Sequence, residues 1–289
     1  MQRLPAPKNR KREILFVYGH HSSIERWFGL TEVLNRYGAV TVPDLPGFGG
    51  MESYYKIGVK PTIDALADYL ATFVKLRYKN KRFTIVGLSL GFAIATRMLQ
   101  KYPELAKRVD LVISVVGFVN HEEFRFKRRN YLLMRYAASF FSNRVPAWIC
   151  KHLFLRPVFI RLAYKLQAGS NAKLKDATQS SDATELKARI NFEVQLWKSN
   201  DVRTYMETAV SMFKLDLCRQ TVSLPVHHIS VASDRYFNNH IVEQHLGVIF
   251  TKAHIIPARL PAHAPTVLAD AKAAAAIIPT KVRRLLAAK

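Results

Sequence analysis

The sequence predicts an α/β fold in which a mostly parallel, twisted sheet is flanked by helices. Short apolar runs alternate with amphipathic helical patterns over the first 120 residues. The runs are nearly continuous in hydrophobicity, which is typical of strands buried on both faces. From about residue 118 to 220 the chain has helical character without a clear strand, and strand-like runs then return. We therefore expect a sheet domain formed by residues 1–117 and 221–289, interrupted by a helical cap or lid at residues 118–220.

The expected strands are rich in Val and Ile and are followed by turn residues. They are ILFVYG (14–19), AVTVPD (39–44), FTIVG (83–87), VDLVISVVG (109–117), LPVHHISVAS (224–233) and AHIIPARL (253–260). The repetition of strand, helix and strand implies right-handed crossovers, and hence a parallel arrangement of neighbouring strands.

Apolar residues spaced three and four apart predict the helices that connect these strands. The first covers residues 23–38 and ends in Gly38 as a C-cap, and the others cover 62–80 and 91–103. A last helix is expected from Pro265, because proline is tolerated in the first turn, where a missing N–H costs nothing.

Charge and cysteine content restrict the partners and the compartment. The chain has 44 Lys and Arg against 21 Asp and Glu, a net charge of +23 that favours anionic partners. A general basic bias of the proteome is the alternative, because these residues are spread over the whole chain. Cys150 and Cys218 form no disulfide framework and no metal-ligand cluster, so we expect a cytoplasmic protein without metal or cofactor.

Two kinds of segment are not expected in this chain. The basic start is followed by an apolar run too short for a signal peptide, and no segment approaches the roughly 20 apolar residues of a membrane span. No nucleic-acid-binding motif is recognised either, so specific nucleic-acid binding is not predicted.

One pentapeptide carries a chemical signal, Gly87-Leu88-Ser89-Leu90-Gly91. It joins a strand to a helix, and small flanking residues permit the sharp turn that holds a serine hydroxyl exposed beside a base. The first N–H groups of the following helix favour negative charge. Taken alone, the motif also fits an ordinary turn whose serine caps the helix.

Five segments, in this order, resemble the α/β-hydrolase superfamily. They are ILFVYGHHSSIERW, VPDLPGFGGMES, MLQKYPELAKRVDLVISVVG, LPVHHISVASDRYFNNH and LPAHAPTVLADAKAAAAII. The resemblance implies a nucleophile at Ser89, a general base at His263 and an acid at Asp234 that orients the imidazole. It also implies an oxyanion hole formed by the backbone N–H groups of His20 and Leu90.

Alternatives to these assignments exist within the sequence. Some members of the superfamily place the acid after the preceding strand, which here means Glu122 or Glu123. The remaining histidines include His20 and His21, which flank the oxyanion turn and fit either pocket lining or packing. Two more, His227 and His228, fall inside an expected strand and are interpreted as structural.

Three positions depart from common family patterns. These are Tyr18 where many members have histidine, Phe92 after the motif, and Ala262 before His263. None of them removes a reacting atom, but they make close analogy in substrate uncertain.

The expected function is that of a serine hydrolase acting on a carboxylic ester or related acyl bond. Interleaved aromatic, aliphatic and basic residues in the insertion suggest a hydrophobic acyl substrate and peripheral contact with an anionic membrane surface. Core packing by the aromatics and a solvated basic face are the simpler interpretation of the same residues. A peptidase, a hydrolase of carbon–carbon bonds and a catalytically silent binding protein are the alternative functions, and the sequence leaves the oligomeric state open.

Overall fold

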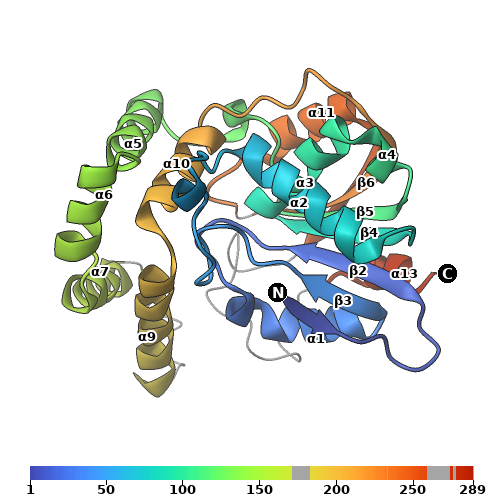
Figure 1. Cartoon of the computed structure of the whole chain (residues 1–289), viewed down its shortest axis with the longest axis horizontal. Coiled ribbons are helices and arrows are strands. Elements are labelled where there is room, and N and C mark those ends of the chain that lie inside the picture. Colours follow the sequence, from blue (N-terminus) through green and yellow to red (C-terminus); the bar gives the residue numbers. More distant parts are fainter. Residues whose placement is uncertain (171–182, 233, 259–273, 276–277, 289) are drawn as a thin grey trace.

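Seven strands form one sheet in the computed structural model, which describes residues 1–170, 183–232, 234–258, 274–275 and 278–288 (Figure 1). The strands lie in the order β1-β3-β2-β4-β5-β6-β7. β1 is antiparallel to β3 and all other pairs are parallel, which confirms the predicted α/β fold. Their bounds are β1 Gln2–Leu4, β2 Arg12–Val17, β3 Gly38–Val42, β4 Phe83–Leu88, β5 Val109–Val115, β6 Val222–Val231 and β7 Phe250–Ala258.

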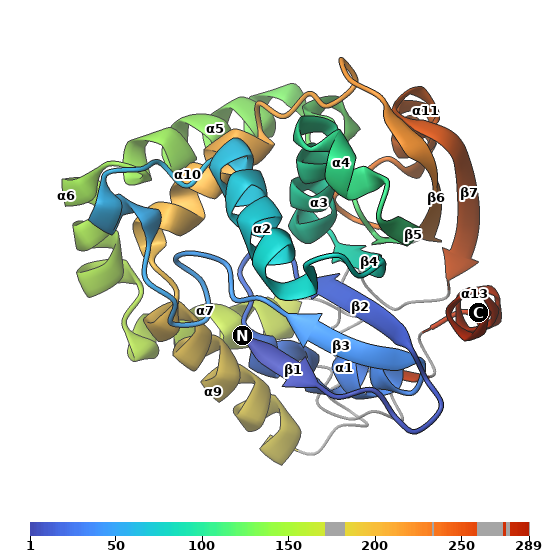
Figure 2. The same cartoon turned by 45° about the vertical axis from the view of Figure 1, so that its right-hand side comes forward.

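Helices cover both faces of this sheet. Figure 2 shows α1 and α13 on one face, and α2, α3 and α11 on the other. Strands β3 and β4 are buried along their whole length, as their continuous apolar sequences predict. The bounds are η1 Ile24–Trp27, α1 Phe28–Asn35, η2 Tyr54–Ile57, α2 Ile63–Tyr78, α3 Leu90–Lys101, α4 Pro103–Ala106, α11 Asn239–Ile249 and α13 Thr280–Ala287.

A set of helices lies between β5 and β6, in the segment predicted to be a helical cap. In Figure 1, α5, α6 and α7 form an outer layer at the edge of the molecule, while α9 and α10 lie between them and the sheet domain. The division at residues 118–220 into core and cap stays a prediction. The bounds are η3 His121–Glu123, α5 Arg128–Phe141, α6 Arg144–Ile149, the π-helical η4 Cys150–Phe154, α7 Pro157–Ser170, α9 Ala183–Ser199 and α10 Val202–Met212.

The two ends of this insertion lie side by side. Leu217 donates its N–H to the carbonyl of Val119 at 3.1 Å, and His121 donates its N–H to the carbonyl of Leu215 at 2.8 Å. These backbone bonds join the segment that leaves β5 to the segment that enters β6.

Gly38 corrects one sequence prediction. It does not cap α1, whose C-cap is Arg36, but is the first residue of β3. A Cβ on Gly38 would overlap the backbone carbonyl of Arg12 in the neighbouring strand β2. Glycine is therefore required here by the close approach of two strands, and not by a left-handed helix end.

Other elements differ from expectation or fall outside the described part. The short edge strand β1 and the helix α11 have no counterpart among the predicted elements. The helix expected to begin at Pro265 starts in a segment outside the described residues.

We predict that Gly38→Ala lowers the free energy of unfolding by about 2 kcal/mol, because backbone must shift to admit the methyl group. Urea unfolding followed by circular dichroism measures the change. Gly247→Ala is the matched control: Gly247 lies within α11 with open space around it, so alanine should raise stability by about 1 kcal/mol. Equal stability of Gly38→Ala and the unmodified protein would contradict the close approach.

Candidate active site

Ser89 occupies a strained turn between β4 and α3. Its φ of 48° and ψ of −117° lie in a region that L-residues rarely adopt, and the residue is almost completely buried. Its N–H donates to the carbonyl of Val115 at 3.0 Å, and its carbonyl accepts the N–H of Phe92 at 3.0 Å. The strain is thus held by bonds to β5 and to the first turn of α3, the arrangement of a nucleophile elbow.

Each glycine around Ser89 is required by close packing. A Cβ on Gly87 would lie 2.6 Å from the Cα of Phe92. A Cβ on Gly91 would overlap the carbonyl oxygens of Val17 and Tyr18 at the end of β2. The two glycines of the Gly-x-Ser-x-Gly pattern are therefore needed because α3 lies so close to the neighbouring strands. A serine that only capped the helix would not require glycine at both positions.

Asp234 follows β6 in a tight turn and is buried. Its Oδ1 accepts the N–H of Tyr236 at 2.8 Å and the N–H of Phe237 at 3.1 Å. Arg125 donates to the backbone carbonyl of Asp234 at 2.9 Å. These bonds fix the carboxyl group beyond the end of its strand, where a carboxylate that orients a base would have to be held.

The sheet topology brings the predicted triad segments to one edge. β4, β5, β6 and β7 are neighbouring parallel strands, so their carboxyl ends lie along the same side of the sheet. Ser89 follows β4 and Asp234 follows β6. His263 comes after β7 in the chain but lies outside the described residues, so its relation to the other two stays a prediction.

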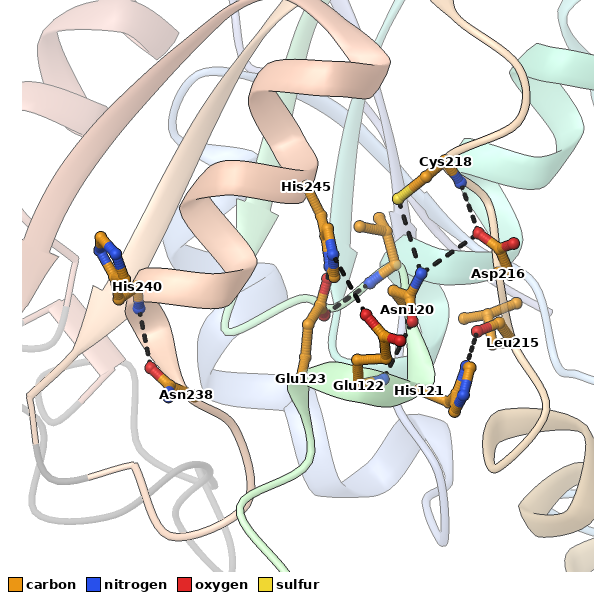
Figure 3. Close-up of polar contacts among 11 residues, drawn as sticks. Asn120, His121, Glu122, Glu123, Leu215, Asp216, Cys218, Asn238, His240 and His245 are labelled. Atoms are coloured by element: carbon orange, nitrogen blue, oxygen red, sulfur yellow. Dashed lines mark hydrogen bonds and ion pairs between the residues drawn. The ribbon is translucent and has the colours of Figure 1, made fainter.

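The alternative acids, Glu122 and Glu123, lie beside His245 (Figure 3). Glu123 is fully buried, and its two carboxylate oxygens accept from the N–H of Val119 and from Nδ1 of His245, both at 2.9 Å. Glu122 is exposed and lies 3.9 Å from Nε2 of the same histidine. His245 is on α11, so this pair joins the start of the insertion to that helix.

The pKa values of both members of this pair are raised, that of Glu123 by burial and that of His245 by hydrogen bonding. Burial raises the pKa of Glu123, against the opposing effect of its hydrogen bond from His245. The hydrogen bond to Glu123 raises the pKa of His245, against the opposing effect of burial. The folded protein therefore holds protons at this pair more tightly than the unfolded chain does.

The turn that follows β2 lies against the elbow. A Cβ on Gly19 would come within 3.2 Å of Cβ of Ser89, so the predicted oxyanion turn and the nucleophile position are in contact. Leu90 is the first residue of α3, and a first-turn N–H has no acceptor within its own helix. The backbone groups of His20 and Leu90 therefore stay the predicted oxyanion donors, on segments that the structure brings together.

The His20 side chain packs against α10. Its Nε2 lies 3.0 Å from the carbonyl of Tyr205 and 2.9 Å from Oγ1 of Thr208, and its ring stacks on the ring of Tyr205 with centroids 4.1 Å apart. Burial lowers the pKa of His20 to about 3, so the imidazole is neutral at physiological pH. The sequence left open whether the His20 side chain lines a pocket or packs in the interior, and the structure shows that it packs against α10.

His21 belongs to a charged cluster that sequence reasoning missed. Its φ is 51°, and its Nε2 lies 3.2 Å from one carboxylate oxygen of Glu193 on α9, while Arg26 donates to the other oxygen at 3.1 Å. Burial raises the pKa of Glu193, but hydrogen bonding from His21 and the charge of Arg26 outweigh it and leave the pKa lowered. No local signal predicts Glu193, which is more than 160 residues from its partners.

Two of the three departures from the family pattern have structural explanations. The Tyr18 hydroxyl accepts the N–H of Leu45 at 2.8 Å, so the tyrosine connects the end of β2 to the loop after β3. Phe92 is fully buried, and its ring stacks on Phe250 of β7 with centroids 5.9 Å apart. The third, Ala262, lies outside the described residues.

The expected structural histidines lie in β6. Nδ1 of His228 is 2.9 Å from Oγ of Ser114 on β5, and burial lowers the pKa of His228 to about 4. The ring of His227 stacks on the ring of His254 in β7 with centroids 4.7 Å apart.

Over the part of the chain that the structure describes, no group of three or more His, Cys, Asp or Glu could hold a metal ion. In the same part, none of the helices has the length and apolar character needed to cross a bilayer.

A family model identifies the chain's family. The model described as alpha/beta hydrolase fold matches residues 14–245, which is most of the chain and includes both Ser89 and Asp234. The protein is therefore an α/β-hydrolase and belongs to this family.

Individual relatives are distant. Protein ABHD8 of Bos taurus and of Homo sapiens is 30% identical over 100 residues, or 34% of this chain. The matched region spans less than a quarter of those relatives, at 23% and 22% of their length.

Solved structures share the fold over nearly the whole chain. A thermophilic esterase from Thermogutta terrifontis has a TM-score of 0.63 at 18% identity, with 99% of this chain and 93% of that chain covered. A hydrolase from Oleispira antarctica has a TM-score of 0.68 at 12% identity, with 100% and 94% covered. At these identities the likeness establishes the fold alone.

We predict that the Glu123–His245 pair makes stability depend on pH. Both folded pKa values are raised, so the stabilisation is present at low pH and is lost as pH rises through the folded values. The double variant Glu123→Gln, His245→Gln removes this pair. The free energy of unfolding of the unmodified protein, measured relative to that of the double variant, should fall by about 1 kcal/mol between about pH 5 and 8.5.

Urea unfolding at several pH values measures this difference. His240→Gln is the control, because His240 is an exposed histidine on the same helix. A difference that rises with pH would contradict the predicted sign.

Proposed function

We propose that the protein is a serine hydrolase that cleaves a carboxylic ester or a related acyl bond through an acyl-enzyme. The observation that carries the proposal is the strained conformation of Ser89, with positive φ, at the carboxyl end of β4. A chain tolerates strain of this kind where the surrounding structure fixes it, and such residues cluster at active sites.

The proposed mechanism uses three side chains and two backbone groups. Ser89 attacks the carbonyl carbon while His263 takes the hydroxyl proton, and Asp234 stabilises the charged imidazole. The N–H groups of Leu90 and His20 would bind the oxyanion, and each such donor is typically worth about 3 to 4 kcal/mol. His263 then protonates the leaving alcohol, and a water molecule activated by the same histidine hydrolyses the acyl-enzyme.

Several features support an acyl ester over other bonds. The thermophilic esterase of the same fold is an enzyme of this class. His263, the proposed general acid, can protonate the leaving alcohol without a cofactor. The helix dipole of α3 favours the negative charge that develops next to Ser89. A hydrophobic acyl group is the proposed substrate portion, because the helices of the insertion are rich in aromatic and aliphatic residues.

A catalytically silent binding protein is the weaker candidate. The departures at Tyr18 and Phe92 would favour it, but Tyr18 bonds to Leu45 and Phe92 stacks on Phe250, and neither contact removes a reacting atom. A peptidase or a hydrolase of carbon–carbon bonds would use the same three residues, so a substrate panel is needed to separate these activities.

A cytoplasmic location stays a prediction.

We predict that a fluorophosphonate probe labels the protein and that Ser89→Ala abolishes the labelling, because the probe forms its bond with an activated serine oxygen. Gel fluorescence and intact-mass measurement report the adduct. Ser223→Ala, at an exposed serine of β6, is the matched control and should label normally. Undiminished labelling of Ser89→Ala would show that Ser89 is not the nucleophile.

We also predict different effects at the two candidate acids. Asp234→Asn should lower kcat for an activated short-chain ester by about 10³- to 10⁴-fold, because the imidazolium loses its carboxylate while Oδ1 can still accept the turn bonds. Glu123→Gln should change kcat less than tenfold, since its oxygens face Val119 and His245. The opposite order of effects would assign the acid to Glu123.

A further inference from the structure

The outer layer of the insertion leaves an unusual amount of apolar side chain in contact with solvent. Among the described residues, 21 large apolar side chains are exposed, and 13 of them fall between residues 132 and 162. They include Leu133, Phe140, Trp148 and Phe154, exposed to 67%, 60%, 62% and 61%. We call this segment, residues 128–162, the outer arm. Contiguous exposed apolar surface is rare on soluble proteins and marks a contact site.

The apolar side chains of α5 lie on the side opposite to its packing contacts. Tyr131 and Ala138 face α10: the Tyr131 hydroxyl donates to the carbonyl of Phe213 just after that helix, and Ala138 is buried. Leu133, Tyr136 and Phe140 follow the spacing i, i+3, i+7, so they form one stripe directed away from α10. This stripe is not the inner face of a cap that packs on the body.

The next helices continue the same surface. In α6 and η4, Ala147 and Cys150 pack against Val202 of α10, whereas Val145 and Trp148 are exposed. In Figure 1, α5, α6 and α7 form the layer farthest from the sheet. The surface is therefore carried by consecutive elements of one arm.

Basic residues are interleaved with the apolar ones, and acidic residues are absent. Residues 124–170 contain ten Lys and Arg and no Asp or Glu, although the whole chain has 21 acidic residues. Arg129, Arg144, Lys151 and Arg156 are all exposed. The net charge of +23 is thus concentrated in part on the surface that also exposes aromatic rings.

We infer that the outer arm binds the surface of an anionic phospholipid bilayer. Lys and Arg attract acidic headgroups while aromatic and aliphatic side chains enter the boundary between headgroups and acyl chains. Trp and Tyr prefer this boundary because one end of each ring is apolar and the other is polar. A protein partner would have to supply both an apolar groove and acidic groups, whereas an anionic bilayer offers both everywhere on its surface.

Vesicle sedimentation tests the inference. The unmodified protein should bind vesicles of phosphatidylcholine with 30% phosphatidylglycerol at least tenfold more tightly than pure phosphatidylcholine, and added salt should weaken the binding. The charge variant Arg129→Glu, Arg144→Glu, Lys151→Glu and the apolar variant Leu133→Glu, Phe154→Glu should each lose at least about tenfold in affinity.

A control variant carries one change of each kind, apolar to acidic and basic to acidic, on another face. Leu76 on α2 is 74% exposed and Arg77 is exposed beside it, so Leu76→Glu, Arg77→Glu should leave vesicle binding within about twofold. Circular dichroism and thermal unfolding verify that every variant folds, which is expected because all substituted side chains are exposed.

Tryptophan fluorescence gives an independent measurement. Trp148 is exposed, whereas Trp27 is only 2% exposed and Trp197 is partly buried. Anionic vesicles should shift the emission to shorter wavelength, and Trp148→Phe should remove the shift without abolishing sedimentation.

Three results would overturn the inference: equal binding to neutral and anionic vesicles, equal binding of the control and the outer-arm variants, or an emission that does not shift. Concentration-dependent dimers that the outer-arm variants dissociate, without any vesicle binding, would assign the surface to a contact between copies of the chain.

Discussion

The first turn of α3 rests directly on the carbonyl groups at the end of β2, and the geometry of the sheet's carboxyl edge depends on this approach. Only a residue without a Cβ fits at Gly91, because Val17 and Tyr18 place their carbonyl oxygens there. Two residues earlier, Ser89 adopts its strained conformation with positive φ at the start of the same helix. The Gly19 turn lies against Ser89 at the same place, so close packing holds the serine, the start of α3 and the end of β2 together.

A second set of contacts holds the insertion over this edge. The neutral ring of His20 bonds to α10, and His21 and Arg26 share the carboxylate of Glu193 on α9. The loop after β3 takes part as well, since Asn200 accepts the N–H of Gly49 at 2.9 Å. The side chains of His20, His21 and Arg26, which follow the Gly19 turn, thus bind the insertion, while Gly19 itself lies against Ser89.

Much of the fold could be predicted because its signals are local. Runs of Val and Ile identify buried parallel strands, and the glycines around Ser89 indicate a turn that admits no side chains. Gly38 shows the limit of such signals. A glycine between a helical pattern and an apolar run fits a helix end equally well, and only the proximity of Arg12 on another strand shows why it is there.

The parts that could not be predicted depend on partners distant in sequence. Glu193 looks like any helical glutamate until folding places it between His21 and Arg26. In the sequence, only motif similarity favours Asp234 over Glu123, whereas in the structure Val119 and His245 bind both carboxylate oxygens of Glu123. Three-residue β1 is too short to carry a hydrophobic period, so it forms because β3 offers an edge.

The adjacent ends of the insertion have an evolutionary consequence. Val119, shortly after β5, and Leu217, shortly before β6, are hydrogen-bonded to each other. The intervening helices therefore form a module whose entry and exit nearly coincide. A module of this kind can be shortened, lengthened or exchanged with that of a relative without changing the distance that the strands must span. Selection can therefore change the surfaces that the protein binds and the substrates that reach Ser89, while the serine turn and the sheet that supports it stay the same.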